Sequence, residues 1–220
     1  MSWDQIPSWT CHRLREFYDE VSSTCSSRDT FVEIGVAYGG SLAYLCERLD
    51  NSLSGVRVSY GQWAVHLEQV EYGDDVRVFG IDIFQDHQGK DQLSPEVWAR
   101  VTGHGNPMVS CRSEMELYCA APTRRVTLIR DNGIDAADGF RDNSVDVLFV
   151  DEHHTFESVG GAINAWLPKV RAGGTIAGHD CNPHYPGVLA AVTKFLPSAE
   201  VRPPHPDDNG WGGVWVWKKP

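Results

Sequence analysis

The chain has 220 residues, of which 41% are hydrophobic and 22% charged, and it carries a formal net charge of −11. This composition is ordinary for a globular protein of one domain and excludes a disordered chain, which would be poorer in aromatic and β-branched residues. The acidic charge disfavours nucleic acids and anionic membrane surfaces as partners. No stretch of the sequence approaches the ~20 consecutive apolar residues of a membrane span.

The six cysteines are irregularly spaced and include no C-x-x-C pair. This pattern fits neither a zinc site nor a disulfide framework, so we expect free, mostly buried thiols in a reducing compartment. The first residues contain no basic region followed by an apolar run, which a signal peptide would have. We therefore expect a cytoplasmic location.

Helical and strand-like segments alternate in the first half of the chain. Apolar residues at helical spacing predict a helix over residues 8–25, and a strand over 31–35 and a helix over 41–49 follow. Residues 51–75 are less regular and predict an insertion, with a strand at 56–60 and a helix at 63–72. The remaining predicted elements of this half are a strand at 76–82, a polar loop at 85–91, and helices at 95–101 and 110–119.

The second half alternates more regularly. Its predicted elements are strands at 125–130, 145–150 and 175–178, helices at 134–139, 156–170 and 187–196, and a closing pair of strands at Val201 and 214–217. Gly173 and Gly174 are expected to stop the helix that begins at Phe156. The alternation predicts one α/β domain over residues 1–220, with a parallel sheet, an antiparallel edge hairpin, an N-terminal helical extension (1–28) and variable substrate-side insertions (51–75 and 84–124).

Ligands of such sheets bind beyond the carboxyl ends of the strands. The first strand runs into Glu33-Ile-Gly35-Val-Ala-Tyr-Gly39-Gly-Ser41, where glycines permit a sharp turn and the close approach of a ligand. Ala37 occupies the second glycine position of G-x-G-x-x-G, which argues against a pyrophosphate ligand. Asp82 ends the next core strand and can accept hydrogen bonds from both hydroxyls of a ribose.

Two later strands also end in polar residues. Asp151, His153 and His154 follow the strand at 145–150, and His179 and Asp180 end the strand at 175–178. If neighbouring strands bring these ends together, Asp151, His154, His179 and Asp180 form one cluster. Such a cluster suits a divalent metal or a general base.

Together these motifs resemble class I S-adenosylmethionine-dependent methyltransferases, and most closely the small-molecule branch that includes macrocin-type sugar O-methyltransferases. The resemblance rests on E-x-G-x-x-x-G-G-S at 33–41, Ile-Asp at 81–82, V-D-x-x-H-x-F-E at 150–157, W-x-P at 166–168 and G-G-x-I-x-G-H-D at 173–180. It implies a doubly wound, mostly parallel seven-stranded sheet of the Rossmann-like methyltransferase kind, and S-adenosylmethionine as the cofactor.

The resemblance also implies roles for particular residues. The cofactor-binding set would be Glu33, Gly35, Gly39 and Ser41 near its methionine end, Asp82 at its ribose, Asp131 and Asn132 at its adenine, and Asp151. Asp151 and Asp180 match positions that bind Mg²⁺ in metal-dependent sugar methyltransferases. His179 stands where a third ligand, usually acidic, is found, which favours Mn²⁺, Fe²⁺ or Zn²⁺ over Mg²⁺. His154 matches a general base, with His153 as the second choice.

The expected reaction is methyl transfer to a hydroxyl of a small molecule, a sugar or natural product. Trp63, Trp98 and Tyr185 are candidates for stacking on the acceptor. Three alternatives remain open: a metal-dependent hydrolase, an NAD-dependent oxidoreductase lacking the usual second glycine, and a cofactor-binding subunit without activity. A homo-oligomer is also left open, because the apolar N-terminal helix and the Trp-rich tail suit either a core or an interface.

Overall fold

Seven strands of the described residues form one sheet in the order β3-β2-β1-β4-β5-β7-β6. The computed structural model describes residues 10–26, 28–37, 39–54, 76–83 and 126–220. The strands are β1 (Thr30–Ile34), β2 (Arg77–Asp82), β3 (Val126–Arg130), β4 (Val145–Val150), β5 (Val170–Gly178), β6 (Glu200–Arg202) and β7 (Val214–Lys218). β1 to β5 pair in parallel, whereas β7 runs antiparallel to both β5 and β6. The predicted parallel sheet with an antiparallel edge is confirmed.

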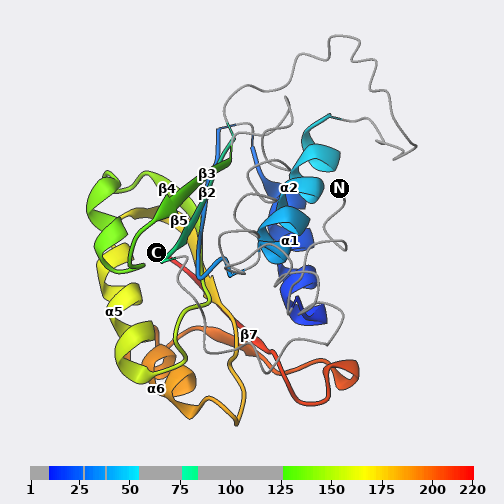
Figure 1. Cartoon of the computed structure of the whole chain (residues 1–220), viewed down its shortest axis with the longest axis vertical. Coiled ribbons are helices and arrows are strands. Elements are labelled where there is room, and N and C mark those ends of the chain that lie inside the picture. The colour runs from blue at the N-terminus through cyan, green and yellow to red at the C-terminus, as the bar shows by residue number, and fades with distance from the viewer. Residues whose placement is uncertain (1–9, 27, 38, 55–75, 84–125) are drawn as a thin grey trace, which may run out of the picture.

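Helices cover both faces of this sheet (Figure 1). On one face lie α1 (His12–Thr24) and α2 (Gly40–Ser54), and on the other lie α5 (Phe156–Trp166) and α6 (Pro186–Phe195), with the 3-10 helices η3 (Asp135–Gly139) and η4 (Pro206–Asp208) in connections. Side chains alternate along β1, so Phe31 packs in the core of the first face, and Val32 and Ile34 in that of the second. The doubly wound architecture follows from two separate apolar cores on one sheet.

Apolar residues of α1 and of the C-terminal strands belong to these cores. The rings of Phe17 and Tyr18 lie 5.3 and 5.2 Å from that of Phe149 on β4. Trp166 and Trp215 are fully buried. Burial of these five aromatic side chains stabilises the fold by roughly 1.5–3 kcal/mol each. The apolar face of α1 and Trp215 of the tail are therefore used within the chain.

The helix predicted over 156–170 ends earlier, and this prediction was wrong for residues 167–170. α5 ends at Trp166, Leu167 is its C-cap, and Val170 already belongs to β5. Pro168 follows the cap and cannot donate a backbone hydrogen bond that would continue the helix. Gly173 and Gly174 accordingly lie inside β5, where Gly173 has a φ of +73° and the register with β4 shifts between Val145 and Val147.

Other boundaries differ less. α1 begins at His12, with the Cys11 side chain capping Leu14 N, and α2 continues to Ser54, past the predicted end at 49. The predicted short helix at 134–139 is the 3-10 helix η3. The elements predicted over 56–72, 95–101 and 110–119 lie outside the described residues. None of the helices among the described residues is long and apolar enough to cross a membrane.

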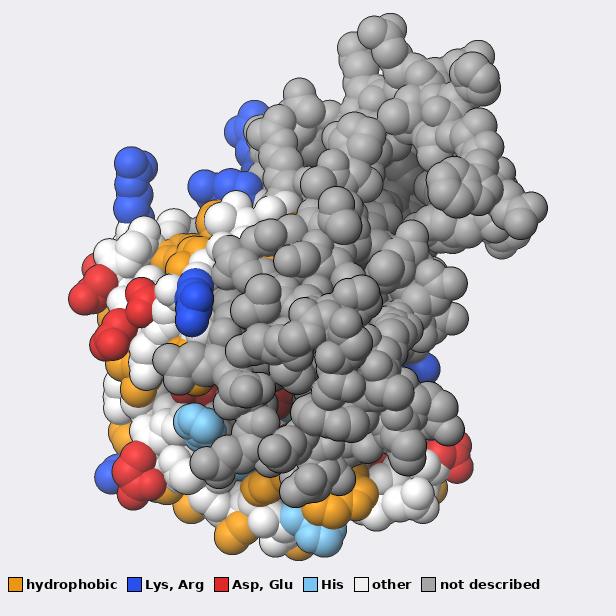
Figure 2. All heavy atoms as spheres, viewed as in Figure 1, with side chains coloured by type: hydrophobic (Ala, Val, Ile, Leu, Met, Phe, Trp, Pro, Cys, Tyr) orange, Lys and Arg blue, Asp and Glu red, His pale blue; other side chains and the backbone are white. Residues whose placement is uncertain are grey.

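On the coloured part of the surface in Figure 2, acidic and basic side chains are both present among apolar ones. Cys46 and Cys181 are buried, Cys11 and Cys25 are partly buried, and none of these four described cysteines forms a disulfide. Burial raises the pKa of Cys25 and of Cys181 to about 11, which keeps both protonated at neutral pH.

Candidate functional site

The turn after β1 brings backbone close to the end of β4. Gly35 has a φ of +85° and Gly39 a φ of +82°, a conformation that favours glycine. The Gly35 N–H donates to Ile81 O at 2.8 Å, and a Cβ on Gly35 would overlap the carbonyl oxygen of Asp151. A side chain at position 35 is therefore excluded by both its backbone angle and its neighbour.

Asp82 ties this turn to the end of β2. Its Oδ2 accepts a hydrogen bond from Ala37 N at 2.9 Å, and Ala37 itself has a φ of +46°. The carboxylate is only partly buried. It is thus held beside the glycine turn, at the carboxyl end of β2.

Glu33 is enclosed rather than open to the edge of the sheet. Its side chain is 2% exposed, with Tyr18 of α1 donating to Oε2 at 2.6 Å and Ser41 of α2 donating to Oε1 at 2.5 Å. Burial raises the pKa of Glu33 to about 7, although the two hydroxyls stabilise its charged form. Of the predicted cofactor residues, Glu33 and Ser41 are therefore hydrogen-bonded to each other and join the two ends of the turn, β1 and α2.

Asp131 and Asn132 follow β3 and are exposed. Asp131 Oδ1 accepts from Asn132 N at 2.8 Å, and Asn132 Oδ1 accepts from Ile134 N at 2.9 Å, which makes a compact polar turn. Asp131 also lines a cavity of about 660 Å³ that extends to Thr30 and Arg77, the first residues of β1 and β2. That cavity runs along the sheet beside η3, whereas the other predicted site residues lie at the carboxyl edge.

The ends of β4 and β5 bring four predicted residues together, as expected. His154 Nε2 lies 2.8 Å from Asp180 Oδ2 and 3.7 Å from Asp151 Oδ1. His179 Nδ1 lies 3.5 Å from Asp151 Oδ2 and 3.4 Å from Asp180 Oδ2. Asp180 has a φ of +55°, an unusual conformation for a residue other than glycine and one that is common at functional sites.

The donor set of this cluster fits a divalent cation. One ligand atom each from Asp151, His154 and Asp180 lies within 4.8 Å of the others. Two carboxylates and an imidazole suit Mn²⁺, Fe²⁺ or Zn²⁺. The sequence had suggested His179 as the third ligand beside the two aspartates. The geometry instead brings His154 into the group, and His179 lies behind it, 7% exposed and with Nε2 3.0 Å from Cys11 Sγ.

The charges of the cluster are strongly coupled. Burial opposes ionisation of Asp151 and Asp180, but the neighbouring histidines outweigh it and lower the pKa of both carboxyls. Burial by itself would lower the pKa of His154, but its pairing with Asp151 and Asp180 raises that pKa to about 9. His154 can therefore accept a proton near neutral pH only when another cation balances these carboxylates. His153 is exposed, so geometry favours His154 of the two predicted bases.

Two contacts of the cluster had no signal in the sequence. The Tyr185 ring stacks on the His154 ring at a centroid distance of 4.1 Å. The sequence had suggested Tyr185 for stacking on the acceptor, and not this contact with His154. Cys11, 168 positions away from His179, contacts it because α1 packs beside β7. Trp63 and Trp98 lie outside the described residues.

The fold and the strand ends define a class of protein: a doubly wound α/β domain with a glycine turn and a cluster of aspartates and histidines at the edge where such sheets bind ligands. The chain belongs to the family described as "Methyltransferase domain", whose model matches residues 32–181. The matched span covers both halves of the site, from β1 to Cys181 after β5. The resemblance to class I S-adenosylmethionine-dependent methyltransferases is confirmed, and the hydrolase and oxidoreductase alternatives are not supported.

Individual similar proteins are distant. An uncharacterized protein, y4gI, of Sinorhizobium fredii is 25% identical over 149 residues, which span 68% of this chain and 13% of that protein. The structure is similar to the O-methyltransferase NovP, with 18% identity, 94% of this chain and 78% of that chain covered, and a TM-score of 0.57. A SAM-dependent O-methyltransferase from Thermotoga maritima has 16% identity, coverage of 98% and 68%, and a TM-score of 0.52. CalS11, a TDP-rhamnose 3′-O-methyltransferase, has 16% identity, coverage of 92% and 76%, and a TM-score of 0.51.

Proposed function

We propose that this chain transfers a methyl group from S-adenosylmethionine to a hydroxyl of a small molecule, a sugar or a natural product. The observation that carries the proposal is the meeting of the glycine turn with the end of β4, where Gly35 leaves no room for a side chain against Asp151. Because the turn touches Asp151, a ligand bound at the turn would lie next to the cluster of Asp151, His154 and Asp180. NovP and CalS11 are both O-methyltransferases, which supports a hydroxyl acceptor, and CalS11 acts on TDP-rhamnose, which supports a sugar.

The glycine turn and the strand ends would hold the cofactor. Gly35 and Gly39 let its methionine end approach the backbone, Asp82 accepts hydrogen bonds from its ribose, and the exposed turn of Asp131 and Asn132 borders its adenine. Asp151 completes the set from β4. Bound S-adenosylmethionine supplies an activated methyl group, so the chain's own contribution is orientation and deprotonation of the acceptor.

The acidic cluster would prepare the acceptor hydroxyl. Asp151 and Asp180 fit a divalent cation, Mg²⁺ or Mn²⁺, which supplies stabilisation of negative charge on the acceptor oxygen. In this arrangement Asp151 and Asp180 would hold the ion, and His154 Nε2, the atom that faces Asp180, would take the hydroxyl proton instead of acting as a third ligand. The stacked Tyr185 ring fixes the orientation of the imidazole.

The first test is calorimetric titration with S-adenosylhomocysteine. We expect micromolar binding that weakens about 100-fold in Asp82→Ala, because two charge-assisted hydrogen bonds are lost. Asp142→Ala is the matched control, since it removes a carboxylate that pairs with Lys169 on the surface. The absence of binding by folded wild-type protein, or equal binding by Asp82→Ala, would contradict the proposed cofactor site.

A second test separates the base from the cofactor site. His154→Ala should lower turnover on a panel of hydroxyl acceptors about 100-fold while S-adenosylhomocysteine binds as before. Titration of the same variant with Mn²⁺ shows whether His154 is a base or a metal ligand. If His154 is the base, the variant binds Mn²⁺ with unchanged affinity; if it is a ligand, the affinity falls. If His153→Ala loses the turnover instead, the base is His153.

A further inference from the structure

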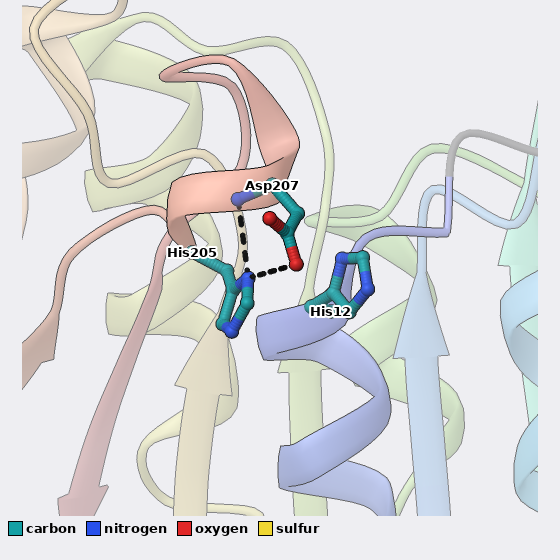
Figure 3. A group of neighbouring side chains, drawn as sticks. All are labelled: His12, His205 and Asp207. Carbon is teal, nitrogen blue, oxygen red and sulfur yellow. Dashed lines mark hydrogen bonds and ion pairs between the residues drawn. The ribbon is translucent and has the colours of Figure 1, made fainter.

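A second group of metal-ligating side chains joins the start of α1 to the segment between β6 and β7. His12 is the first residue of α1, His205 caps η4, and Asp207 lies within η4. One ligand atom from each lies within 4.8 Å of the others (Figure 3). We propose that His12, His205 and Asp207 form a binding site for a divalent transition-metal ion, with Zn²⁺ as the best match. The proposal does not depend on the methyltransferase activity.

The 3-10 turn sets two of the ligands at a suitable spacing. His205 Nδ1 accepts from Asp207 N at 3.2 Å and lies 3.5 Å from Asp207 Oδ2. An ion at Nδ1 would take the lone pair that now accepts this hydrogen bond. Two ligand atoms on a tetrahedral zinc, each bonded at about 2.0–2.1 Å, lie about 3.4 Å apart. The spacing of His205 Nδ1 and Asp207 Oδ2 is therefore that of neighbouring zinc ligands.

A carboxylate engages one nitrogen of the His12 ring. Its Nδ1 lies 2.6 Å from Asp208 Oδ1, and its backbone N–H donates to Asp208 Oδ2 at 3.2 Å. A carboxylate on one ring nitrogen of a histidine leaves the other nitrogen for the metal, and this is the usual arrangement around protein zinc. The His12 ring stacks on that of His205, with centroids 4.7 Å apart.

The chemistry of the donors selects the ion. Two imidazoles and one carboxylate favour Zn²⁺ and similar late transition metals, whereas Mg²⁺ and Ca²⁺ prefer oxygen ligands. The carboxylates of Asp207 and Asp208 together balance a charge of +2. The side chains of Asp207 and His12 are 72% and 42% exposed, so an ion and a completing water have access from solvent.

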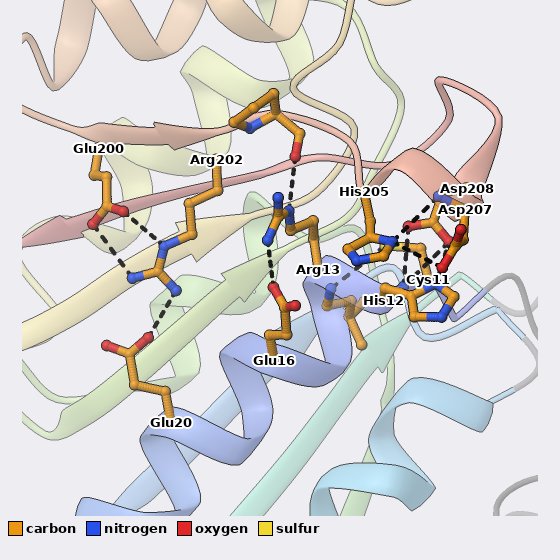
Figure 4. Close-up of polar contacts among 12 residues, drawn as sticks. Cys11, His12, Arg13, Glu16, Glu20, Glu200, Arg202, His205, Asp207 and Asp208 are labelled. Carbon is orange, nitrogen blue, oxygen red and sulfur yellow. Dashed lines mark hydrogen bonds and ion pairs between the residues drawn. The ribbon is translucent and has the colours of Figure 1, made fainter.

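A bound ion would fasten α1 to the C-terminal strands. An ion pair between Arg202 of β6 and Glu20 of α1 lies along the same interface, which Figure 4 shows. His12 follows Cys11, whose Sγ lies 3.0 Å from His179 Nε2 beside the strand-end cluster. We therefore assign the site a structural role, the anchoring of the start of α1 next to the candidate active site.

The test uses protein without a polyhistidine tag, titrated with Zn²⁺ by calorimetry and with Co²⁺ by visible absorption. His205→Asn retains an acceptor for capping η4, and Asp207→Asn is isosteric, so both preserve the local fold. We expect each to weaken one binding equivalent at least 10-fold and to reduce the cobalt bands. Zn²⁺ at about 100 times its Kd should raise the melting temperature of the wild type by about 5 to 10 °C and leave that of His205→Asn nearly unchanged.

Two controls locate the ion. His184→Asn removes an exposed imidazole of a neighbouring loop, stacked on Trp211, and should bind Zn²⁺ as the wild type does. Asp180→Asn disables the strand-end cluster and should retain the equivalent that His205→Asn loses. If His205→Asn and Asp207→Asn bind like the wild type, or if Asp180→Asn alone loses all binding, the proposed site is wrong.

Discussion

Gly35→Ala should destabilise the protein by about 2 to 5 kcal/mol and abolish binding of S-adenosylhomocysteine. An alanine at a positive φ costs about 1–2 kcal/mol. The new Cβ would overlap the Asp151 carbonyl oxygen, so β1 and β4 must separate at the site, with a cost of about 1–3 kcal/mol for overpacking. Urea unfolding followed by tryptophan fluorescence measures the first effect, and calorimetry measures the second.

Alanine variants of two other glycines separate the cost of the positive φ from the cost of the steric overlap. Gly210→Ala tests the backbone angle alone, because Gly210 has a φ of +82° and open space around its Cβ position. Gly139→Ala has open space and no such angle, and it should change stability by less than about 1 kcal/mol. If Gly35→Ala costs no more than Gly210→Ala, the close approach of β1 to Asp151 is not as described.

The stability of the wild type should fall between about pH 5 and pH 7 because of Glu33. Burial raises the folded-state pKa of this carboxyl to about 7 from an ordinary value of 4.5. Between these two values the folded protein binds more protons at Glu33 than the unfolded chain does, so stability is lost as the pH rises. The loss is complete above pH 7 and amounts to about 3 kcal/mol, at 1.36 kcal/mol for each unit of pKa.

Glu33→Gln isolates this effect, because glutamine keeps the shape of the side chain and cannot ionise. The free energies of unfolding of the two proteins should converge near pH 5 and differ by about 3 kcal/mol in favour of the variant at pH 8. Glu16→Gln, on the exposed face of α1, should show a difference that stays within about 1 kcal/mol. A constant difference between wild type and Glu33→Gln from pH 5 to pH 8 would mean that Glu33 ionises normally.

Much of the fold could be predicted because each strand carries its own signal. Val145–Val150 is apolar on both faces and ends at Asp151, as a central parallel strand does. The error at α5 has a local cause: Val159, Ile163, Trp166 and Val170 keep helical spacing across Pro168, so the periodicity hides a change of element. All four of these residues are buried, and burial alone does not distinguish a helix from a strand.

The candidate site also has a part that the sequence predicts and a part that depends on packing. Strand-end residues such as Asp82, Asp151 and Asp180 were predictable because parallel strands place their carboxyl ends at one edge. Enclosure of Glu33 by Tyr18 depends on how α1 packs, which no local pattern specifies. The choice between His154 and His179 depends on which imidazole points outward from the cluster, and the approach of His12 to His205 joins positions 193 apart in the sequence.

The place of β7 in the sheet has a consequence for synthesis. β7 follows β6 in the chain but lies between β6 and β5, bonded to both. While the polypeptide is being made, β5 therefore presents an open, apolar margin until residues 214–218 have emerged, and β6 has nothing to pair with. An unpaired strand margin is the kind of surface that associates with other chains. The nascent protein should be most prone to aggregation in this interval, when chaperone protection would matter most.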